Sequence, residues 1–221
     1  MSFSIPNTPV IISRGTNEFN EYLKLAVNCF FKEASGYIEH NKDFDIFEYS
    51  NEASLCSFFV NGLVRNDGDK YSITAAMEYS TKRKAGIGRT DMFVRYKNLA
   101  IWTESKYDRV RAIKADHSEH WDIKGWLEWD KLNIYSQAIE YYNFEGPQAN
   151  KTYENHYIMT LAFKLIDEDP QSFQNEAEEH LRKKIDDEGY DRSWYYSVGF
   201  FNPEEKKSKG IEVYGTVVKM T

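Results

Sequence analysis

The sequence predicts a single α/β domain in which a mixed β-sheet is flanked by helices. Apolar residues recur at helical spacing in two early segments, and they alternate or form short runs in several later ones. The chain has 221 residues, of which 41% are apolar and 16% are aromatic, enough to bury one substantial core. We therefore expect one domain over residues 1–221, with a helical region within about residues 1–50.

Two helices are expected before the first strand. From residue 18 to about residue 39, apolar side chains follow the three- and four-residue spacing of one helix face. A second helix is expected from about Glu52 to Val64, where residues 65–68 form a strong turn signal. Two later helices are expected, at about residues 131–144 and, rich in acidic residues, at about 170–188.

The strands are predicted from alternation and from short apolar runs. Residues 71–79 alternate, and residues 89–95 and 99–106 form a hairpin. Residues 111–130 contain three tryptophans among charges and receive no assignment. Three more strands are expected at residues 153–165, 194–201 and 211–220.

The hairpin predicts a close group of charged side chains. With a two-residue loop at Lys97-Asn98, the register brings Asp91 directly opposite Glu104, and Lys106 lies two residues further on the same face. Like charges facing each other destabilise a sheet unless a divalent cation lies between them. A slip of one residue would separate the carboxylates unless a bulge restored them. The pattern predicts a metal site beside a lysine.

Asp91, followed after an apolar run by Glu104-Ser105-Lys106, resembles the active-site signature of the PD-(D/E)XK nuclease superfamily. Restriction endonucleases and lambda-exonuclease-type nucleases belong to this superfamily. The resemblance implies a restriction-endonuclease-like core and Mg²⁺ (or Mn²⁺) bound by Asp91, Glu104 and the backbone carbonyl of Ser105. It also implies that Lys106 orients or activates the attacking water. One position departs from the pattern, because Thr90 stands where the family has proline.

A glutamate on the second predicted helix is a further candidate for the site. Glu52 falls on the same helix stripe as the apolar residues Leu55, Cys56, Phe59 and Leu63. In several branches of the family a helix glutamate completes the metal shell, so the resemblance implies Glu52 as an additional ligand. The alternative is that Glu52 lies in the first helical turn, where a negative charge favours the helix dipole.

Gln137 and Tyr141 lie four residues apart on the helix expected after the hairpin and so on one side of it. Their spacing looks like the Gln-x-x-x-Tyr motif of lambda-exonuclease-like and helicase-associated nucleases. The resemblance implies that the two side chains reach toward the active site and the nucleic acid. An ordinary amphipathic helix is the alternative.

The net charge of −7 hides an uneven distribution. Residues 82–114 contain ten basic and three acidic residues, a balance of +7, whereas residues 167–191 contain three basic and ten acidic residues, a balance of −7. Phosphate binding depends on such local charge. We expect the basic residues near the motif to bind nucleic-acid phosphates, although charge on a surface hairpin also serves solubility. These residues are Arg89, Lys82, Arg83 and Lys84.

Other kinds of site have weaker support. His117 and His120, with acidic neighbours, could form a zinc patch, but exposed histidines in a charged loop are commoner. The chain has no glycine-rich phosphate loop and no Gly-x-Ser-x-Gly elbow. Cys29 and Cys56 are too few for a disulfide framework. Because no long apolar stretch or signal peptide is evident, we expect a cytoplasmic protein without a membrane partner.

The sequence therefore predicts a Mg²⁺-dependent nuclease that hydrolyses phosphodiester bonds in DNA, alone, as a homo-oligomer or with a partner protein. Restriction, phage defence and recombination or repair all use this fold. One alternative is a catalytically silent subunit that binds nucleic acid or assembles with other proteins. Another is a protein-interaction module whose acidic residues 167–191 dock a partner.

Overall fold

In the part of the chain that it describes, the computed structural model has two helices, α1 (Asn17–Asn41) and α3 (Glu52–Asp67), and a sheet of eight strands. The strands are β1 (Ser2–Phe3), β2 (Val10–Ser13), β3 (Ile73–Arg83), β4 (Gly86–Tyr96), β5 (Leu99–Asp108), β6 (Asn155–Ile166), β7 (Arg192–Asn202) and β8 (Lys207–Met220). The residues that the structure describes are 2–3, 10–13, 17–41, 52–67, 73–83, 86–108, 155–166, 182, 186, 192–202 and 207–220.

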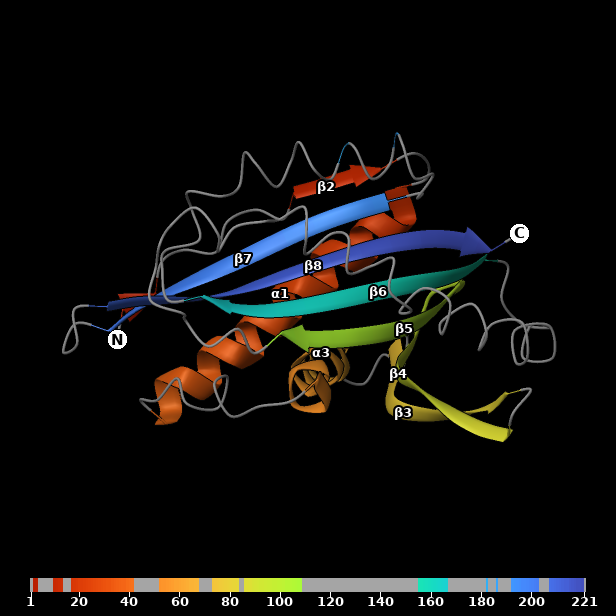
Figure 1. Ribbon diagram of the computed structural model, residues 1–221, viewed down its shortest axis with the longest axis horizontal. Helices are drawn as coiled ribbons and strands as arrows, with labels where there is room; N and C mark the ends of the chain where they lie inside the picture. The colour runs from red at the N-terminus through yellow and green to blue at the C-terminus, as the bar shows by residue number, and fades with distance from the viewer. Residues whose placement is uncertain are drawn as a thin grey trace.

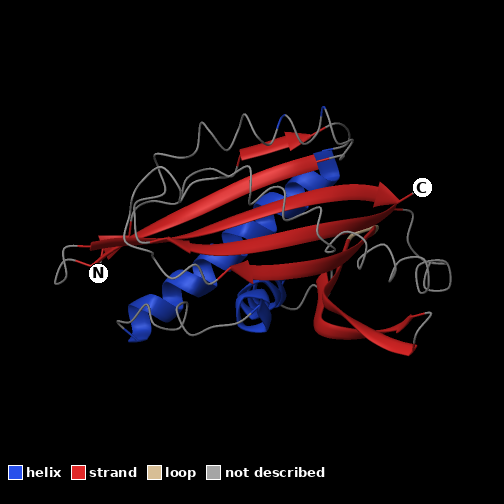
Figure 2. Ribbon diagram, in the orientation of Figure 1, coloured by secondary structure: helices blue, strands red, loops and turns tan. Residues whose placement is uncertain are grey.

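The eight strands form one mixed sheet in the order β1–β7–β8–β6–β5–β4–β3, with β2 also paired to β7. Strands β5 and β6 run parallel, and every other described pair is antiparallel. Helix α1 crosses the sheet on one side, and α3 lies near β4 and β5 (Figures 1 and 2). The predicted class, an α/β protein with helices against a mixed sheet, is confirmed in this general form.

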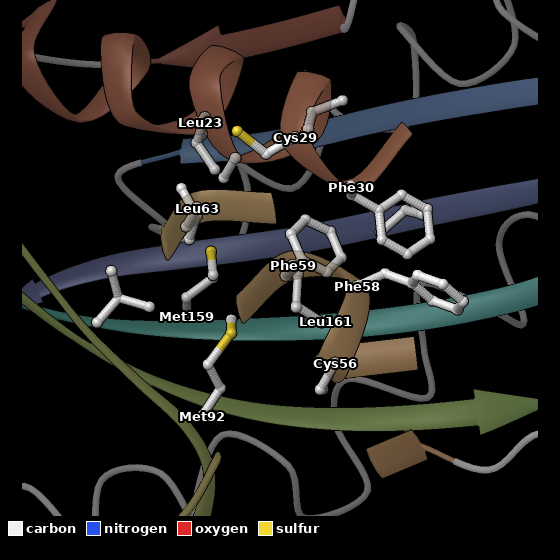
Figure 3. Packing of buried hydrophobic residues seen from close by; sticks show 14 of the residues in the cluster. Leu23, Cys29, Phe30, Cys56, Phe58, Phe59, Leu63, Met92, Met159 and Leu161 are labelled. Carbon is white, nitrogen blue, oxygen red and sulfur yellow. The ribbon is translucent and has the colours of Figure 1, made fainter. Parts of the chain in front are cut away.

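The main hydrophobic core lies between the two helices and one face of the sheet. Phe30 of α1 stacks on Phe59 of α3 with ring centroids 4.5 Å apart, and both rings lie 5.9 Å from Phe163 of β6. Figure 3 shows Phe30, Phe58 and Phe59 grouped over the sheet. Burial of each such ring contributes about 1.5–3 kcal/mol. The apolar residues that predicted the first helix are all buried: Phe19, Tyr22, Leu23, Ala26, Val27 and Phe30.

The two helices approach each other closely at Gly62. A Cβ atom at this position would lie 2.6 Å from the carbonyl oxygen of Cys29 in α1. Only a glycine leaves room for the Cys29 backbone at this distance, so Gly62 allows α3 to pack directly on α1. This contact fixes the position of α3 relative to α1. It therefore also positions the α3 residues that face β5.

The predicted elements differ from the structure mainly at their ends. Helix α3 continues to Asp67, whose Oδ2 accepts a hydrogen bond from the backbone N–H of Ile73, 2.9 Å away. Strand β3 continues to Arg83, beyond the alternation that ended at Tyr79. Strands β1 and β2 were not predicted, because two and four residues are too few to show a period.

Several predicted elements lie outside the described residues. These are the helix at residues 131–144, the unassigned segment 111–130 and most of the acidic segment 170–188, of which Arg182 and Asp186 are described and helical. Among the described residues, no helix is both long enough and apolar enough to cross a membrane.

Candidate active site

The hairpin of β4 and β5 has the predicted register as far as its ladder extends, but the predicted pair Asp91–Glu104 is not part of that ladder. The ladder begins at the pair Tyr96–Leu99 and ends at the pair Met92–Thr103. The loop consists of Lys97 and Asn98, and Lys97 adopts a left-handed conformation with φ of 53°. A two-residue hairpin loop needs a positive φ angle at its first residue, so Lys97 accepts a conformation that glycine adopts more easily.

Asp91 stands one residue beyond the end of this ladder, and its side chain makes the next connection to β5. Its Oδ2 atom accepts a hydrogen bond from the backbone N–H of Ser105 at 2.6 Å and a second from the Ser105 hydroxyl at 2.9 Å. Asp91 is partly buried. The structure therefore places the aspartate of the predicted signature in direct contact with the Glu104-Ser105-Lys106 segment, through a side-chain contact with Ser105.

Thr90, at the position where the resembled family has proline, also ties the two strands together. Its hydroxyl donates a hydrogen bond to the carbonyl oxygen of Thr103 at 2.8 Å. The Thr90 side chain is fully buried. Proline could not make this bond, so threonine supplies at this position a polar cross-link beside Asp91.

Ser105 also links the site to helix α3. The thiol of Cys56 donates a hydrogen bond to the Ser105 hydroxyl, with 3.3 Å between sulfur and oxygen. A chain of hydrogen bonds thus runs from α3 through Ser105 to Asp91. The roles of Cys56 and of the Ser105 hydroxyl were not predicted from the sequence. Alternation along β5 places Ser105 on the apolar helix side, and that signal could have indicated a buried polar contact there.

Glu104 occupies the other face of β5, because neighbouring residues of a strand point to opposite faces. Alternation from Met92 would turn Asp91 toward this same face, but β4 leaves the ladder with β5 at Asp91, and the Asp91 carboxylate instead bonds to the hydroxyl of Ser105. Glu104 is only 5% exposed. A carboxylate is seldom so deeply buried unless it is paired, hydrogen-bonded or bound to a metal.

The polar character of this face continues into the neighbouring strands. Thr160 of β6 is in register with Glu104, and Thr216 of β8 is in register with Thr160. Both threonines are buried, and their hydroxyl oxygens are 2.7 Å apart in a hydrogen bond. A buried polar row therefore crosses three strands and begins at the carboxylate of Glu104.

The other predicted residues are placed only by their backbone. Lys106 lies in β5, two residues after Glu104, and Glu52 is the first residue of α3, one turn before Cys56. The place of Glu52 in the first helical turn also suits the alternative role, in which its negative charge interacts favourably with the helix dipole. In the neighbouring hairpin of β3 and β4, Arg89 pairs with Ser80. The hairpin also includes Lys82 and Arg83, while Lys84, Gln137, Tyr141, His117 and His120 lie outside the described residues.

The described side chains supply two carboxylates to the site. Among the residues that the structure describes in full, no group of three or more histidine, cysteine, aspartate or glutamate side chains comes together. Asp91 and Glu104, with the backbone carbonyl of Ser105, offer oxygen ligands of the kind that Mg²⁺ prefers. The chemical nature of these oxygen atoms thus suits a hard divalent cation.

Comparisons with protein-family models, with curated proteins and with solved structures found no match for this chain.

Proposed function

We propose that the protein is a metal-dependent nuclease that hydrolyses phosphodiester bonds in DNA. The observation that carries the proposal is the contact of the Asp91 carboxylate with Ser105, the middle residue of Glu104-Ser105-Lys106. The two parts of the signature, Asp91 and the Glu104-Ser105-Lys106 segment, lie on adjacent strands and are in contact. A chance occurrence of the same pattern in the sequence would not require this contact.

The topology also supports the proposal. Strands β3, β4 and β5 form an antiparallel meander, and β6 then adds parallel to β5, which gives a mixed sheet with α1 and α3 on one face. A restriction-endonuclease-like core has a mixed sheet flanked by helices, so the candidate carboxylates lie on central strands of a compatible sheet. We infer such a core in a single domain over residues 1–221.

In this proposal Asp91 and Glu104 bind Mg²⁺ (or Mn²⁺), with the carbonyl oxygen of Ser105 and the carboxylate of Glu52 as further ligands. When bound, the ion polarises the scissile phosphate and lowers the pKa of a coordinated water. Lys106 orients that water or stabilises the negative charge that develops on the phosphate. Arg89 and the basic residues 82–84 bind neighbouring phosphates, and Gln137 and Tyr141 steady the substrate strand.

The hydrogen bonds of Asp91 favour this role. Both donors from Ser105 bind Oδ2, and no described residue donates to Oδ1. The carboxylate is therefore fixed in orientation, while its second oxygen stays available for a cation. Such preorganisation matters because a misplaced ligand would have to reorganise during the reaction.

The test is a cleavage assay on plasmid, linear duplex and single-stranded DNA with Mg²⁺, Mn²⁺ or EDTA. The variants are Asp91→Asn, Glu104→Gln and Lys106→Ala. Asparagine keeps an oxygen that can accept the Ser105 bonds, so the fold should survive while the metal ligand loses its charge. The control is Glu21→Gln, an exposed carboxylate on α1 that pairs with Lys97 at 3.1 Å.

We expect cleavage that requires the metal, persists in Glu21→Gln and falls by about 10³-fold or more in each site variant. Cleavage that survives in all three site variants would assign the activity to another site or to a contaminant. Nucleic-acid binding without cleavage of any substrate would instead support the catalytically silent subunit.

A further inference from the structure

Strand β5 determines which oxygen of the Asp91 carboxylate can bind another group. The Oδ2 atom of Asp91 accepts two hydrogen bonds from Ser105, one from the backbone N–H at 2.6 Å and one from the hydroxyl at 2.9 Å. A carboxylate oxygen has two lone pairs, so these two donors occupy both acceptor positions of Oδ2. Oδ1 is therefore the oxygen through which Asp91 can hold a cation.

Helix α3 fixes the direction of the Ser105 hydroxyl. A serine hydroxyl has one O–H donor, which rotates toward the acceptors around it. The thiol of Cys56 donates a hydrogen bond to the Ser105 oxygen at 3.3 Å, and Figure 3 shows Cys56 on the side of α3 that faces β5. Because the thiol is the donor in this contact, the proton of the Ser105 hydroxyl is directed to Asp91.

Both groups that hold Asp91 in this way are enclosed in the protein. Cys56 and Ser105 are fully buried, whereas Asp91 is partly buried. Removing a partner of a buried polar group costs more than removing one at the surface, because water cannot replace the lost bond. The two contacts therefore connect α3 firmly to a carboxylate that solvent still reaches.

The number of available oxygens on Asp91 limits how this residue binds metal. A carboxylate that bridges two cations gives one oxygen to each of them. With both lone pairs of Oδ2 occupied, Asp91 has Oδ1 alone to offer and so binds a single ion. One such oxygen is sufficient, because Mg²⁺ keeps several waters and needs only one or two carboxylates from a protein.

We propose that Ser105, oriented by Cys56, makes Asp91 a ligand with one available oxygen, so that Asp91 holds one divalent cation and does not bridge two. Ser105 and Cys56 are positioning residues, because they act through Asp91 and not on the substrate. This role rests on the proposed nuclease function, and it adds the number of ions that Asp91 holds and the residues that set this number.

The test counts bound Mn²⁺ by electron paramagnetic resonance without DNA, since free and protein-bound Mn²⁺ give different signals. The chain has 35 acidic residues, so the quantity to compare is the number of ions lost in Asp91→Asn. In this variant the single amide oxygen accepts the bonds from Ser105, which places the NH₂ group where Oδ1 would meet the cation. Thermal unfolding in EDTA checks that each variant is folded.

We expect Asp91→Asn to lose one ion per protein molecule. Ser105→Ala should keep this ion but weaken its binding about fivefold to tenfold, because the hydroxyl that orients the carboxylate is lost while the backbone N–H remains. Ser105→Thr keeps the hydroxyl and should bind Mn²⁺ as the wild type does.

The variants of Cys56 test whether the orientation comes from α3. Cys56→Ala should weaken Mn²⁺ binding about threefold, whereas Cys56→Ser keeps a donor and should stay within about twofold of the wild type. Cys29→Ala is the matched control, because it makes the same change at a buried cysteine that packs against Gly62. This control should leave the binding of Mn²⁺ unchanged.

A loss of two ions in Asp91→Asn, or of none, would overturn the proposal. Equal Mn²⁺ affinity in the wild type and Ser105→Ala would also overturn it, as would equal weakening in Cys56→Ala and Cys29→Ala. Cleavage assays in Mg²⁺ separate this proposal from the nuclease function. One ion held by Asp91 without cleavage of any DNA would retain the ion and reject the nuclease, whereas cleavage with two ions lost in Asp91→Asn would reject the single ion alone.

Discussion

The two halves of strand β4 differ in their surroundings, although both pair with β3. The inner half, from Met92 to Tyr96, lies between β3 and β5, and Met92, Phe93 and Val94 are at most 5% exposed. The outer half, from Gly86 to Thr90, pairs with β3 alone among the described strands. Asp91 lies at the boundary, bonded through its side chain to Ser105. The candidate site is thus placed where the three-stranded pairing ends and the two-stranded ribbon of β3 and β4 begins.

This division separates two requirements that a catalytic carboxylate has to meet. The inner half supplies rigidity, because its neighbours on both sides fix the backbone position of Asp91. The outer half, which no longer pairs with β5, is where the proposed function expects the substrate to bind. In that arrangement, the precise position of the carboxylate and the binding of the substrate would be provided by different residues.

The largest expected effect is the loss of packing in the inner half. Met92→Ala should lower the free energy of unfolding by about 3 kcal/mol, because a fully buried side chain is removed and a cavity is left. Lys82→Ala in the outer half should change it by less than about 0.5 kcal/mol. Denaturant unfolding of both variants measures the difference. Similar losses in the two variants would mean that the ribbon is packed as firmly as the core.

The second effect concerns the helix that supports the inner half. Gly62→Ala should destabilise the protein by about 2 kcal/mol, since the new methyl group would collide with the backbone of Cys29 and overpack the contact. Gly36→Ala on α1 is the control, because no atom lies within 4 Å of the position that its new methyl group would take. This control should gain about 0.5–1 kcal/mol from helix propensity.

Thermal or denaturant unfolding of the two alanine variants gives the comparison. A stabilised Gly62→Ala variant would show that α1 and α3 are not in close contact. The cleavage activity of Gly62→Ala, measured below its unfolding temperature, would further show whether the position of α3 reaches the site through Cys56 and Ser105.

Much of the fold could be predicted from the sequence, because periodicity reports local structure directly. The alternation and the two-residue loop at Lys97-Asn98 predict the register of β4 and β5, and the structure confirms it from Tyr96–Leu99 to Met92–Thr103. The end of that ladder could not be predicted, because it depends on β4 leaving β5 at Asp91. The residue at which two strands separate depends on tertiary contacts, and the periodic pattern of apolar residues does not indicate it.

The candidate site was predicted in part for the same reason. Asp91 and the Glu104-Ser105-Lys106 segment stand out as a pattern, and the register predicts that they lie near each other, but it does not predict that Asp91 bonds to Ser105. The contribution of Cys56 depends instead on how α3 packs on the sheet, and the close approach at Gly62 that sets this packing joins residues far apart in sequence. The polar pair of Thr160 and Thr216 likewise requires knowledge of the order β5–β6–β8.

The third effect lies at the boundary between the two halves of β4. Ser105→Ala removes one of the two hydrogen bonds to Asp91 and leaves the bond from the backbone N–H, so we expect a loss of about 1 kcal/mol in stability. If the hydroxyl also orients Asp91, the metal concentration for half-maximal cleavage should rise several-fold, whereas a purely structural role would leave it unchanged. Ser105→Thr keeps the hydroxyl and should restore the wild-type metal dependence.

The smallest effect at neutral pH is expected at Tyr22, which packs against Tyr96 at the end of the inner half with ring centroids 5.8 Å apart. The Tyr22 hydroxyl is buried and has no hydrogen-bond partner among the described residues. Tyr22→Phe removes this polar group, so its free energy of unfolding at pH 7 should stay within about 1 kcal/mol of the wild-type value.

The variant should differ from the wild type mainly at alkaline pH. Burial, followed by the nearby Cys29, raises the pKa of Tyr22 above its ordinary value of 10.0. The unfolded tyrosine then ionises before the folded one, and the wild type loses stability as the pH rises through 10. Burial also raises the pKa of Cys29, but that contribution is present in both proteins. At pH 11 we expect the wild type to have lost about 1.4 kcal/mol more than Tyr22→Phe. Parallel stability curves for the two proteins would show that Tyr22 reaches solvent and that the inner half is less firmly packed than we infer.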